Sequence, residues 1–296
     1  MALNHTIEST NALEVHNLSS TFKGQRVLYS FSFKFRKGEV YGIVGPSGSG
    51  KSVFCEHLNG LHRSETANIY YASGEKILFF NSKLKNYKAI RREVGIVFQL
   101  PEYQLFKETV LQDIIFGPKI LFNLQKYELP RWEEKAKAIL SELSFPLELV
   151  NSSPFKLSGG QKRKVTLAGI LILEPKVIVF DEPTLGLDPQ STEQVLELVK
   201  ELKKKKVTII LVSSNMDFIF ESTDTTLFLN EGRLQKTQPT YSFFRNCPKE
   251  LIKPKVISFI EKLSAFNAYF ERLWEYQPRN ILELAESIDN LVKNFS

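Results

Sequence analysis

Eight consecutive residues carry the pattern G-x-x-x-x-G-K-[S/T], which is typical of a loop that wraps nucleotide phosphates. Glycines let backbone N–H groups approach phosphate oxygens, the lysine neutralises the β and γ phosphates, and the serine hydroxyl ligates Mg²⁺. A glycine-rich turn is the alternative, but chance places this pattern in roughly one such chain in a hundred. We therefore predict a nucleotide-binding loop made of Gly45, Pro46, Ser47, Gly48, Ser49, Gly50, Lys51 and Ser52.

Two carboxylates, Asp181 and Glu182, follow a second apolar run, 177–180. Ligand crevices of open α/β sheets form at the carboxyl ends of such strands. Asp181 is then placed to hold Mg²⁺, and Glu182 to orient the attacking water or accept its proton. An apolar run followed by Asp is by itself only a strand end, but together with the phosphate loop it predicts nucleotide hydrolysis.

A third motif, Ser158-Gly159-Gly160-Gln161, precedes a helical segment. Its serine and glycines present free backbone N–H groups at a positive helix end, which suits a γ-phosphate. Taken alone, the motif is better explained as a helix cap and turn.

The order of the motifs resembles that of the ATP-binding cassette (ABC) ATPases over about Leu13 to Lys236. Along the chain they are the phosphate loop, Gln99, the string 157–164, Asp181-Glu182-Pro183-Thr184 and Gly186-Leu187-Asp188. The resemblance implies a dimer in which each ATP, with Mg²⁺, lies between one subunit's phosphate loop and the other subunit's signature sequence. Ser158 to Gln161 would therefore complete the partner's site.

The resemblance also implies roles for three further residues. Gln99 would contact Mg²⁺ and the attacking water, so that the metal set is Ser52, Gln99 and Asp181. Phe22 occupies the place of an aromatic that stacks on adenine, although a core strand phenylalanine is an equal alternative. Asp188 matches a loop that couples the two sites of the dimer.

Ser214 departs from the family pattern, because it occupies the place of a histidine that grips the γ-phosphate. All four histidines lie at or before His62, so none is available downstream. Removing one preorganised donor to a developing oxyanion costs about 10² to 10³ in rate. We therefore expect an asymmetric heterodimer in which the site at Lys51 is slow or mainly structural, while the site completed by Ser158 stays active. The catalytic set of this chain's own site is then Glu182, Gln99 and Ser214.

The segment 98–118, the Ser153-Pro154-Phe155 stretch and the chain beyond Pro239 are similar to the second of the two ATPase subunits of energy-coupling factor (ECF) importers. This resemblance implies a second ATPase subunit, a transmembrane T component and a substrate-binding S component as partners. It places the chain peripherally on the cytoplasmic face of the cell membrane. Candidate acidic contacts to the T component are Glu102, Glu108 and Asp113, each of which is equally typical of a solvated surface charge.

A different class of function is a soluble, nucleotide-gated protein that binds nucleic acid or ribosomes, for which the net charge of +6 would serve. Such cassette proteins usually carry two cassettes or a long coiled-coil insertion. The 296 residues contain one phosphate loop, so we favour the importer and expect no nucleic-acid partner. The transported substrate, a vitamin or a transition-metal ion, is selected by another subunit and stays open.

The elements that must position these residues alternate between strands and helices, which predicts an α/β fold with a mainly parallel sheet. We expect an antiparallel pair from Leu13 to about Tyr41 that turns at Lys23-Gly24. Further strands are expected at 40–44, 69–80, 94–98, 177–180 and 207–212, and a hairpin at 226–232. Helices are expected within 101–143, with breaks at Gly117-Pro118 and Pro130, from Gly160 to Glu174 and at 191–206. A last helix is expected to have Pro278 in its first turn.

Length and composition fit this architecture. A hydrophobic share of 43% with 24% charged residues supports a packed interior. The two cysteines exclude a disulfide framework, and neither a secretion signal nor a membrane-spanning run is expected. We divide the chain into a tail, 1–12, an ABC-type ATP-binding domain, 13–238, with a helical signature subdomain at about 100–165, and a small α-rich C-terminal dimerisation domain, 239–296. For the apolar face of this last domain, at Ile281, Leu284 and Ile288, an internal core is the alternative to a dimer contact.

Overall fold

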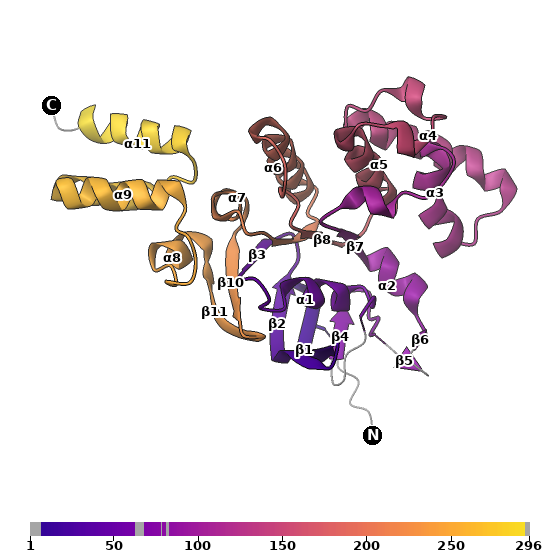
Figure 1. Ribbon diagram of the computed structural model, residues 1–296, viewed down its shortest axis with the longest axis horizontal. Coiled ribbons are helices and arrows are strands. Elements are labelled where there is room, and N and C mark those ends of the chain that lie inside the picture. The colour runs from indigo at the N-terminus through magenta and orange to yellow at the C-terminus, as the bar shows by residue number, and fades with distance from the viewer. Residues whose placement is uncertain (1–6, 63–67, 78, 81–82, 294–296) are drawn as a thin grey trace.

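The computed structural model describes residues 7–62, 68–77, 79–80 and 83–293 of the chain. Within these residues the main sheet has six strands, of which five run parallel and one closes an antiparallel hairpin (Figure 1). In spatial order they are β11 (Arg233–Pro239), β10 (Thr225–Asn230), β3 (Val40–Val44), β9 (Thr208–Val212), β8 (Val177–Asp181) and β7 (Val94–Val97). The predicted α/β class is confirmed.

The central strands are buried on both faces, which explains their continuous apolar sequences. Side chains alternate between two cores, so that Val40 and Val44 join the core on one face while Tyr41 and Ile43 join the other. The carboxyl ends of β3, β9 and β8 meet at one edge, since Ile43 and Asp181 both pair with Val212. This edge therefore brings the ends of three strands to one place.

A separate antiparallel sheet, in the order β2-β1-β4, lies against the first helix. Its strands are β1 (Asn11–Phe22), β2 (Gln25–Arg36) and β4 (Asn68–Tyr71). The expected turn at Lys23 and Gly24 is confirmed, with positive φ angles of 48° and 79° that match the twist of a tight hairpin. The ring of Phe31 packs 4.4 Å from that of Phe54 in α1 (Lys51–Leu58). The sheet thereby supports the helix that follows the phosphate loop.

The expected single strand over 69–80 is wrong. β4 ends at Tyr71, and the chain turns at Gly74, whose φ of 88° only glycine adopts easily. A short pair, β5 (Phe79–Phe80) and β6 (Lys83–Leu84), follows, and Leu78 lies outside the described residues. The tail residues 1–6 and the last three residues, 294–296, also lie outside them.

A helical subdomain with its own apolar core follows β7 and lies at the right of Figure 1. Its helices are α3 (Val110–Leu121), α4 (Leu129–Glu142) and α5 (Gly159–Leu171). The expected break at Gly117-Pro118 is wrong, because α3 continues through Pro118, which is buried and whose carbonyl accepts from the Phe122 N–H at 2.9 Å. Packing of the buried ring offsets the lost backbone hydrogen bond. Helix α5 ends three residues earlier than expected.

The remaining helices cover the main sheet and build the C-terminal extension, which lies at the left of Figure 1. They are α2 (Tyr87–Glu93), α6 (Pro189–Lys204), α7 (Met216–Ser222), α8 (Thr240–Arg245), α9 (Lys255–Phe266), α10 (Leu273–Tyr276) and α11 (Ile281–Lys293). Short 3₁₀ helices span Pro101–Gln104, Lys126–Glu128, Leu147–Leu149, Pro154–Lys156 and Ala268–Arg272. Pro278 is buried but precedes α11, so its expected place in the first helical turn is wrong.

The apolar face expected on the last helix is divided between two environments. Leu284 is buried and Ile288 is partly buried against the main core, whereas Ile281 is 67% exposed. The inward face is completed by Leu291, one period further along α11. Two of the three expected residues therefore belong to an internal core.

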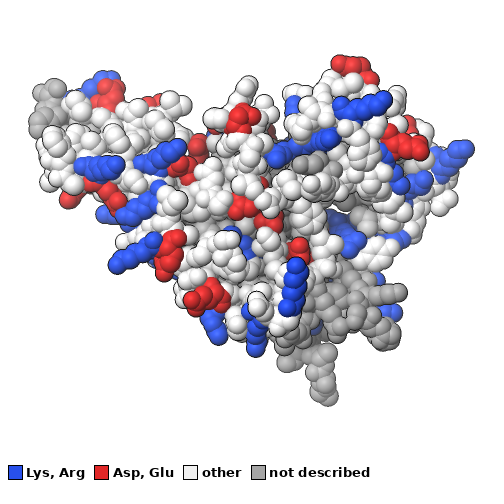
Figure 2. Space-filling view, viewed as in Figure 1, with Lys and Arg blue, Asp and Glu red and all other residues white. Residues whose placement is uncertain are grey.

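No helix among the described residues is long and apolar enough to cross a bilayer. On the face that Figure 2 shows, Lys and Arg side chains are interspersed with Asp and Glu side chains over the C-terminal extension, the sheet and the helical subdomain. This distribution differs from the continuous basic strip that is typical of proteins that follow a nucleic-acid backbone.

Candidate functional site

The phosphate loop connects the end of β3 to the start of α1 and allows only glycine at two of its positions. A Cβ on Gly45 would lie 1.9 Å from the carbonyl oxygen of Leu229, which no side chain can accommodate. Gly50 has a φ of 98°, and a Cβ there would lie 2.8 Å from the carbonyl oxygen of Val27. The loop is therefore tightly enclosed by strands β2 and β10, and its backbone shape follows from these glycines.

Lys51 begins α1 and turns back over the loop. Its Nζ donates to the carbonyl oxygens of Gly45 and Pro46, each at 2.9 Å. Burial lowers the pKa of Lys51, while the nearby carboxylates of Glu182 and Asp181 act in the opposite direction. The lysine thus places a positive charge between the loop and the two carboxylates, which is where phosphate oxygens would need it.

Asp181 is the last residue of β8 and is 8% exposed. Burial raises the pKa of its carboxyl group, and a hydrogen bond from Ser52 partly offsets this effect. Its Oδ1 atom is buried and has no protein partner. Mg²⁺ binds through few protein oxygens together with water and substrate phosphates, so an orphaned carboxylate oxygen beside a serine hydroxyl fits this ion. Ser52 and Asp181 are the residues that would hold it.

Glu182 follows Asp181 in a left-handed conformation, with a φ of 50°. Its backbone N–H donates to the carbonyl oxygen of Val212 at 2.8 Å. One carboxylate oxygen, Oε2, accepts from the Ser214 N–H at 2.9 Å, from the Ser214 hydroxyl at 3.1 Å and from the Ser213 hydroxyl at 3.4 Å. A positive φ at a non-glycine residue costs free energy, and such strain gathers at functional sites. Ser213 was not singled out by the sequence patterns, although its place beside Ser214 at a strand end could have indicated it.

The structure places Gln99 and Phe22 at the surface. Gln99 is exposed and lies two residues beyond β7, the strand next to β8. Phe22 ends β1, is 39% exposed, and its ring centroid lies 5.7 Å from that of His62. The alternative of a core strand phenylalanine is therefore wrong. The sequence patterns did not predict that His62 lies beside the Phe22 ring.

The signature sequence lies on the helical subdomain, at the start of α5, whereas the phosphate loop opens α1 elsewhere on the main sheet (Figure 1). Ser158 is the N-cap of α5, and its hydroxyl accepts from the Gln161 N–H at 3.3 Å while the Gln161 side chain accepts from the Ser158 N–H at 2.9 Å. Added Cβ atoms at Gly159 and Gly160 would meet nothing within 4 Å. The motif is thus a capped helix end that faces open space.

Asp188 caps the N-terminus of α6, where its carboxylate accepts from the Ser191 N–H at 2.9 Å and from the Ser191 hydroxyl at 2.7 Å. The backbone hydrogen bond from Ser191 lowers the pKa of Asp188. This residue therefore fixes the start of α6 directly after the loop that carries the Gly186-Leu187-Asp188 motif.

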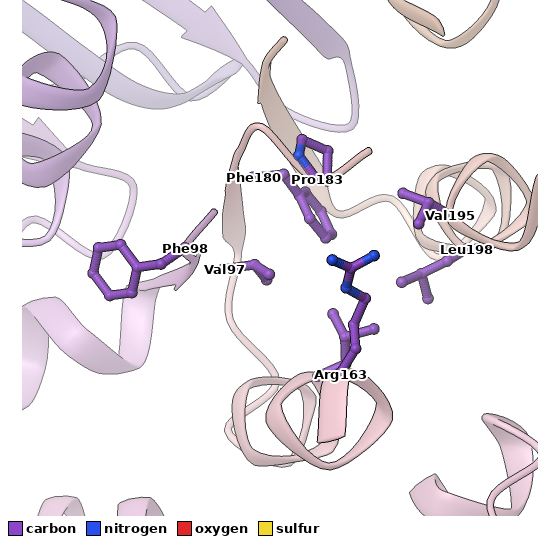
Figure 3. A pocket seen from close by; sticks show the side chains of 8 residues that line it. Val97, Phe98, Arg163, Phe180, Pro183, Val195 and Leu198 are labelled. Atoms are coloured by element: carbon purple, nitrogen blue, oxygen red, sulfur yellow. The ribbon is translucent and has the colours of Figure 1, made fainter. Parts of the chain in front are cut away.

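Arg163 lies within the string 157–164, but the sequence patterns gave it no role of its own. It projects from α5 into a small cavity between α5, β8 and α6, and Figure 3 shows its guanidinium pointing toward Phe180 and Pro183. These two residues flank Asp181 and Glu182 along the chain. Arg163 thus lies between the signature helix and the strand end that carries the carboxylate pair.

The three acidic residues expected at a partner surface differ in their surroundings. The Oδ2 atom of Asp113 accepts from the N–H groups of Phe106 and Lys107 at 2.8 and 2.7 Å, so this carboxylate fixes the chain before α3 and is not a free surface charge. Glu108 is exposed, and the side chain of Glu102 lies outside the described part of the chain.

Together, the phosphate loop, the strand-end carboxylates and the separate signature helix define an ATP-hydrolysing cassette. The family profile described as "ABC transporter" matches residues 28–185. This chain belongs to the ABC transporter family of ATPases, and its relatives place it in the energy-coupling factor group.

Among those relatives, the energy-coupling factor transporter ATP-binding protein EcfA2 of Mycoplasma genitalium is 37% identical, over 97% of this chain and 96% of that protein. The EcfA2 protein of Acetivibrio thermocellus is 36% identical, over 91% of this chain and 92% of that protein. Among solved structures, CbiO1 of Clostridium perfringens, part of the ABC transporter complex CbiONQ, superimposes with a TM-score of 0.69 at 29% identity, over 90% of this chain and 99% of that one. The chain is thus an ATP hydrolase coupled to transmembrane transport.

Proposed function

We propose that this chain forms one half of an ATPase heterodimer that energises an ECF importer of vitamins or transition-metal ions. The observation that carries the proposal is the separation of two motifs within one chain. The phosphate loop opens α1, whereas Gly159 and Gly160 face open space on another subdomain. Each motif therefore needs its complement from a second subunit, and the expected partner is another ATPase chain.

At this chain's own site, the phosphate loop would hold ATP, with Lys51 beside its β and γ phosphates. Mg²⁺, when bound by Ser52 and Asp181, supplies positive charge that offsets the charge developing on phosphate oxygens. Glu182 would orient the attacking water, and Gln99 would lie at the same edge of the sheet. Phe22, exposed at the end of β1, offers a ring on which adenine can stack.

We further propose that this site turns over slowly. Ser214 has a short hydroxyl that is directed to Glu182 at 3.1 Å, and it lacks the reach of an imidazole toward a γ-phosphate. The partner's site is completed by Ser158, Gly159, Gly160 and Gln161, and carries most of the hydrolysis. A purified partner that hydrolysed ATP alone as fast as the heterodimer would contradict this division of labour.

The surface proposed for the transmembrane T component follows the exposed Gln99. Leu100, Tyr103 and Phe106 are 47%, 82% and 54% exposed, and we propose that they form an apolar patch before α3. Exposed apolar patches of this kind mark contacts with other proteins or with membranes. A separate S component would select the transported substrate, and the chain would lie peripherally on the cytoplasmic face of the cell membrane.

The C-terminal extension is proposed to strengthen the heterodimer. Exposed apolar side chains on its surface are Ile252, Phe266, Ile281 and Leu282, at 81%, 86%, 67% and 77% exposure. Burial of such side chains in an interface is favourable, at about 25 cal/mol per Å² of apolar surface.

Affinity capture of the tagged chain from detergent-extracted membranes tests the proposed function. We expect a second ABC ATPase and an integral membrane protein to be retained together with the chain, and the ATPase pair to dissociate more slowly with Mg-ATP. Retention of RNA or ribosomes, without a membrane protein, would contradict the importer and favour the nucleic-acid alternative.

A further inference from the structure

The C-terminal extension holds helix α7 at its C-terminal end. Arg279 lies just before α11, and its Nη1 donates to the carbonyl oxygens of Phe220 at 2.8 Å and Thr223 at 3.3 Å. The guanidinium also lies over the ring of Phe220, 5.4 Å from its centroid. Burial lowers the pKa of Arg279. A cation beside the last carbonyls of a helix satisfies those acceptors and complements the helix dipole.

The extension also holds the other end of the same helix. Asp217, in the first turn of α7, accepts the backbone N–H of Lys255 at 2.7 Å, and the Lys255 ammonium lies 3.5 Å from its second oxygen. Lys255 is the first residue of α9. A further bond joins Asn280 to Glu221 at 3.2 Å. The seven residues of α7 are therefore bracketed at both ends by residues from beyond position 250.

On its opposite side, α7 packs against the strand that leads into the phosphate loop. A Cβ on Gly42 in β3 would lie 2.7 Å from a methyl group of Ile219. After the helix, Asp224 accepts the Val40 N–H at 3.0 Å and donates its own N–H to the Val40 carbonyl oxygen at 2.7 Å. Strand β3 therefore blocks movement of α7 toward the sheet. Contacts from the C-terminal extension fix the position of the helix in the remaining directions.

The N-terminus of α7 continues directly into the serines that contact Glu182. The Asn215 side chain caps the helix by accepting the Phe218 N–H at 3.1 Å, and the Asn215 N–H donates to the Ser213 hydroxyl at 3.1 Å. Ser213 and Ser214 in turn donate to Glu182. A displacement of α7 therefore moves the donors that orient the carboxylate.

We propose that Arg279 and Asp217 are positioning residues through which the C-terminal extension holds the Ser213-Ser214 segment against Glu182. A partner that shifts the extension would thereby change hydrolysis at this chain's own phosphate loop. The inference rests on the roles proposed above for Glu182 and Ser214, and it adds a route from the dimerising end of the chain to the site.

Single-turnover ATP hydrolysis by the heterodimer tests this route. The partner subunit carries an amide in place of its catalytic carboxylate, so that the measured rate is that of the site at this chain's phosphate loop. We expect Arg279→Ala and Asp217→Ala each to lower the rate constant roughly three- to tenfold, with the Kd for Mg-ATP changed by less than about twofold. Asp217→Asn keeps an oxygen that accepts the Lys255 N–H and should restore the rate. Arg272→Ala is the matched control, because Arg272 contacts the Tyr269 ring within the extension at 5.6 Å and should leave the rate unchanged.

The same variants in a Ser213→Ala/Ser214→Ala background separate positioning from simple destabilisation. If the extension acts partly through the serine hydroxyls, the loss caused by Arg279→Ala should be smaller there, and the remaining loss comes from the Ser214 N–H, which alanine keeps. An equal loss in both backgrounds, or full activity of Arg279→Ala and Asp217→Ala, would overturn the inference. Full activity of Ser213→Ala/Ser214→Ala alone would instead overturn the role proposed for Ser214. Should Arg279→Ala fail to fold, the Asp217→Ala and Asp217→Asn pair carries the test.

Discussion

Ser214 donates both its backbone N–H and its hydroxyl to a single oxygen of Glu182, at 2.9 and 3.1 Å. The Ser213 hydroxyl reaches the same oxygen at 3.4 Å. A carboxylate that accepts several hydrogen bonds has few orientations left. Ser214, where the family pattern has a histidine, therefore contacts the carboxylate in this structure. We propose that the γ-phosphate lacks the donor that a histidine would supply.

Restoring an imidazole should accelerate this chain's own site. With the partner's site silenced, we expect Ser214→His to raise single-turnover hydrolysis by roughly ten- to a hundredfold, since a donor to a developing oxyanion contributes about that much or more. Ser214→Ala keeps the backbone donor and should lower the rate only a few-fold. The measurement is phosphate release after rapid mixing with Mg-ATP. An unchanged rate in Ser214→His would show that the serine does not limit the site.

Gly45→Ala should damage both the fold and nucleotide binding. The added methyl would collide with the Leu229 carbonyl oxygen at 1.9 Å, so the loop or strand β10 must move. We expect a loss of about 2 to 3 kcal/mol in the free energy of unfolding, and Mg-ATP affinity reduced more than about tenfold. Urea denaturation and titration calorimetry measure the two effects. Gly159→Ala, where a Cβ meets nothing within 4 Å, is the control and should change neither by much.

His57 in α1 should make the stability of the domain depend on pH. Burial, followed by the charge of His62, lowers the pKa of His57 to about 3, and its Nδ1 lies 2.9 Å from the Val53 carbonyl oxygen. The folded state therefore binds fewer protons than the unfolded state between the two pKa values. The contribution of His57 to the free energy of unfolding is complete above pH 6.5 and is lost as the pH falls toward 3. At pH 5 this loss is about 2 kcal/mol.

Urea denaturation at pH 7.5 and pH 5 measures this effect. His57→Gln, which carries no titrating group, should show a difference between the two pH values that is smaller by about 2 kcal/mol. An identical pH dependence in both proteins would contradict a buried neutral imidazole at this position.

Tyr103 and Tyr127 provide a matched pair for the proposed membrane contact, because both side chains are 82% exposed on the helical subdomain. Tyr103→Ser should weaken retention of the transmembrane component roughly tenfold, since aromatic side chains dominate such interfaces. Hydrolysis by the ATPase pair without the membrane component should not change. Tyr127→Ser should leave retention intact. Equal losses in the two variants would argue against the patch at Leu100, Tyr103 and Phe106.

The regular strands could be predicted from the sequence because their chemistry is local. The apolar runs 40–44 and 177–180 mark strands buried on both faces, and the turn at Lys23-Gly24 follows from the need for positive φ. The loop of Gly45 to Ser52 was found in the same way, because it is a continuous pattern.

Other features depend on partners that are distant in the chain. Arg279 contacts carbonyl groups 56 and 59 residues away in the chain. The hydrogen bonds from Ser213 and Ser214 to Glu182 connect the segments that follow strands β9 and β8. Pro118 stays helical because its ring is buried, which its local sequence does not indicate. The carboxylate of Asp113 is directed to its own chain because the turn before α3 offers two N–H groups. Such tertiary contacts override local preference, and only the folded chain reveals them.

We propose that two unlike subunits share two unequal sites. The steady-state ATPase rate of the heterodimer tests this proposal through two single variants. Gly159→Glu places a carboxylate where the partner's γ-phosphate is expected, in open space and at a helix start that tolerates negative charge. Lys51→Ala disables only this chain's own site. We predict that Gly159→Glu lowers the rate more than about tenfold, whereas Lys51→Ala lowers it less than about twofold. A Lys51→Ala heterodimer as inactive as the Gly159→Glu heterodimer would contradict the account.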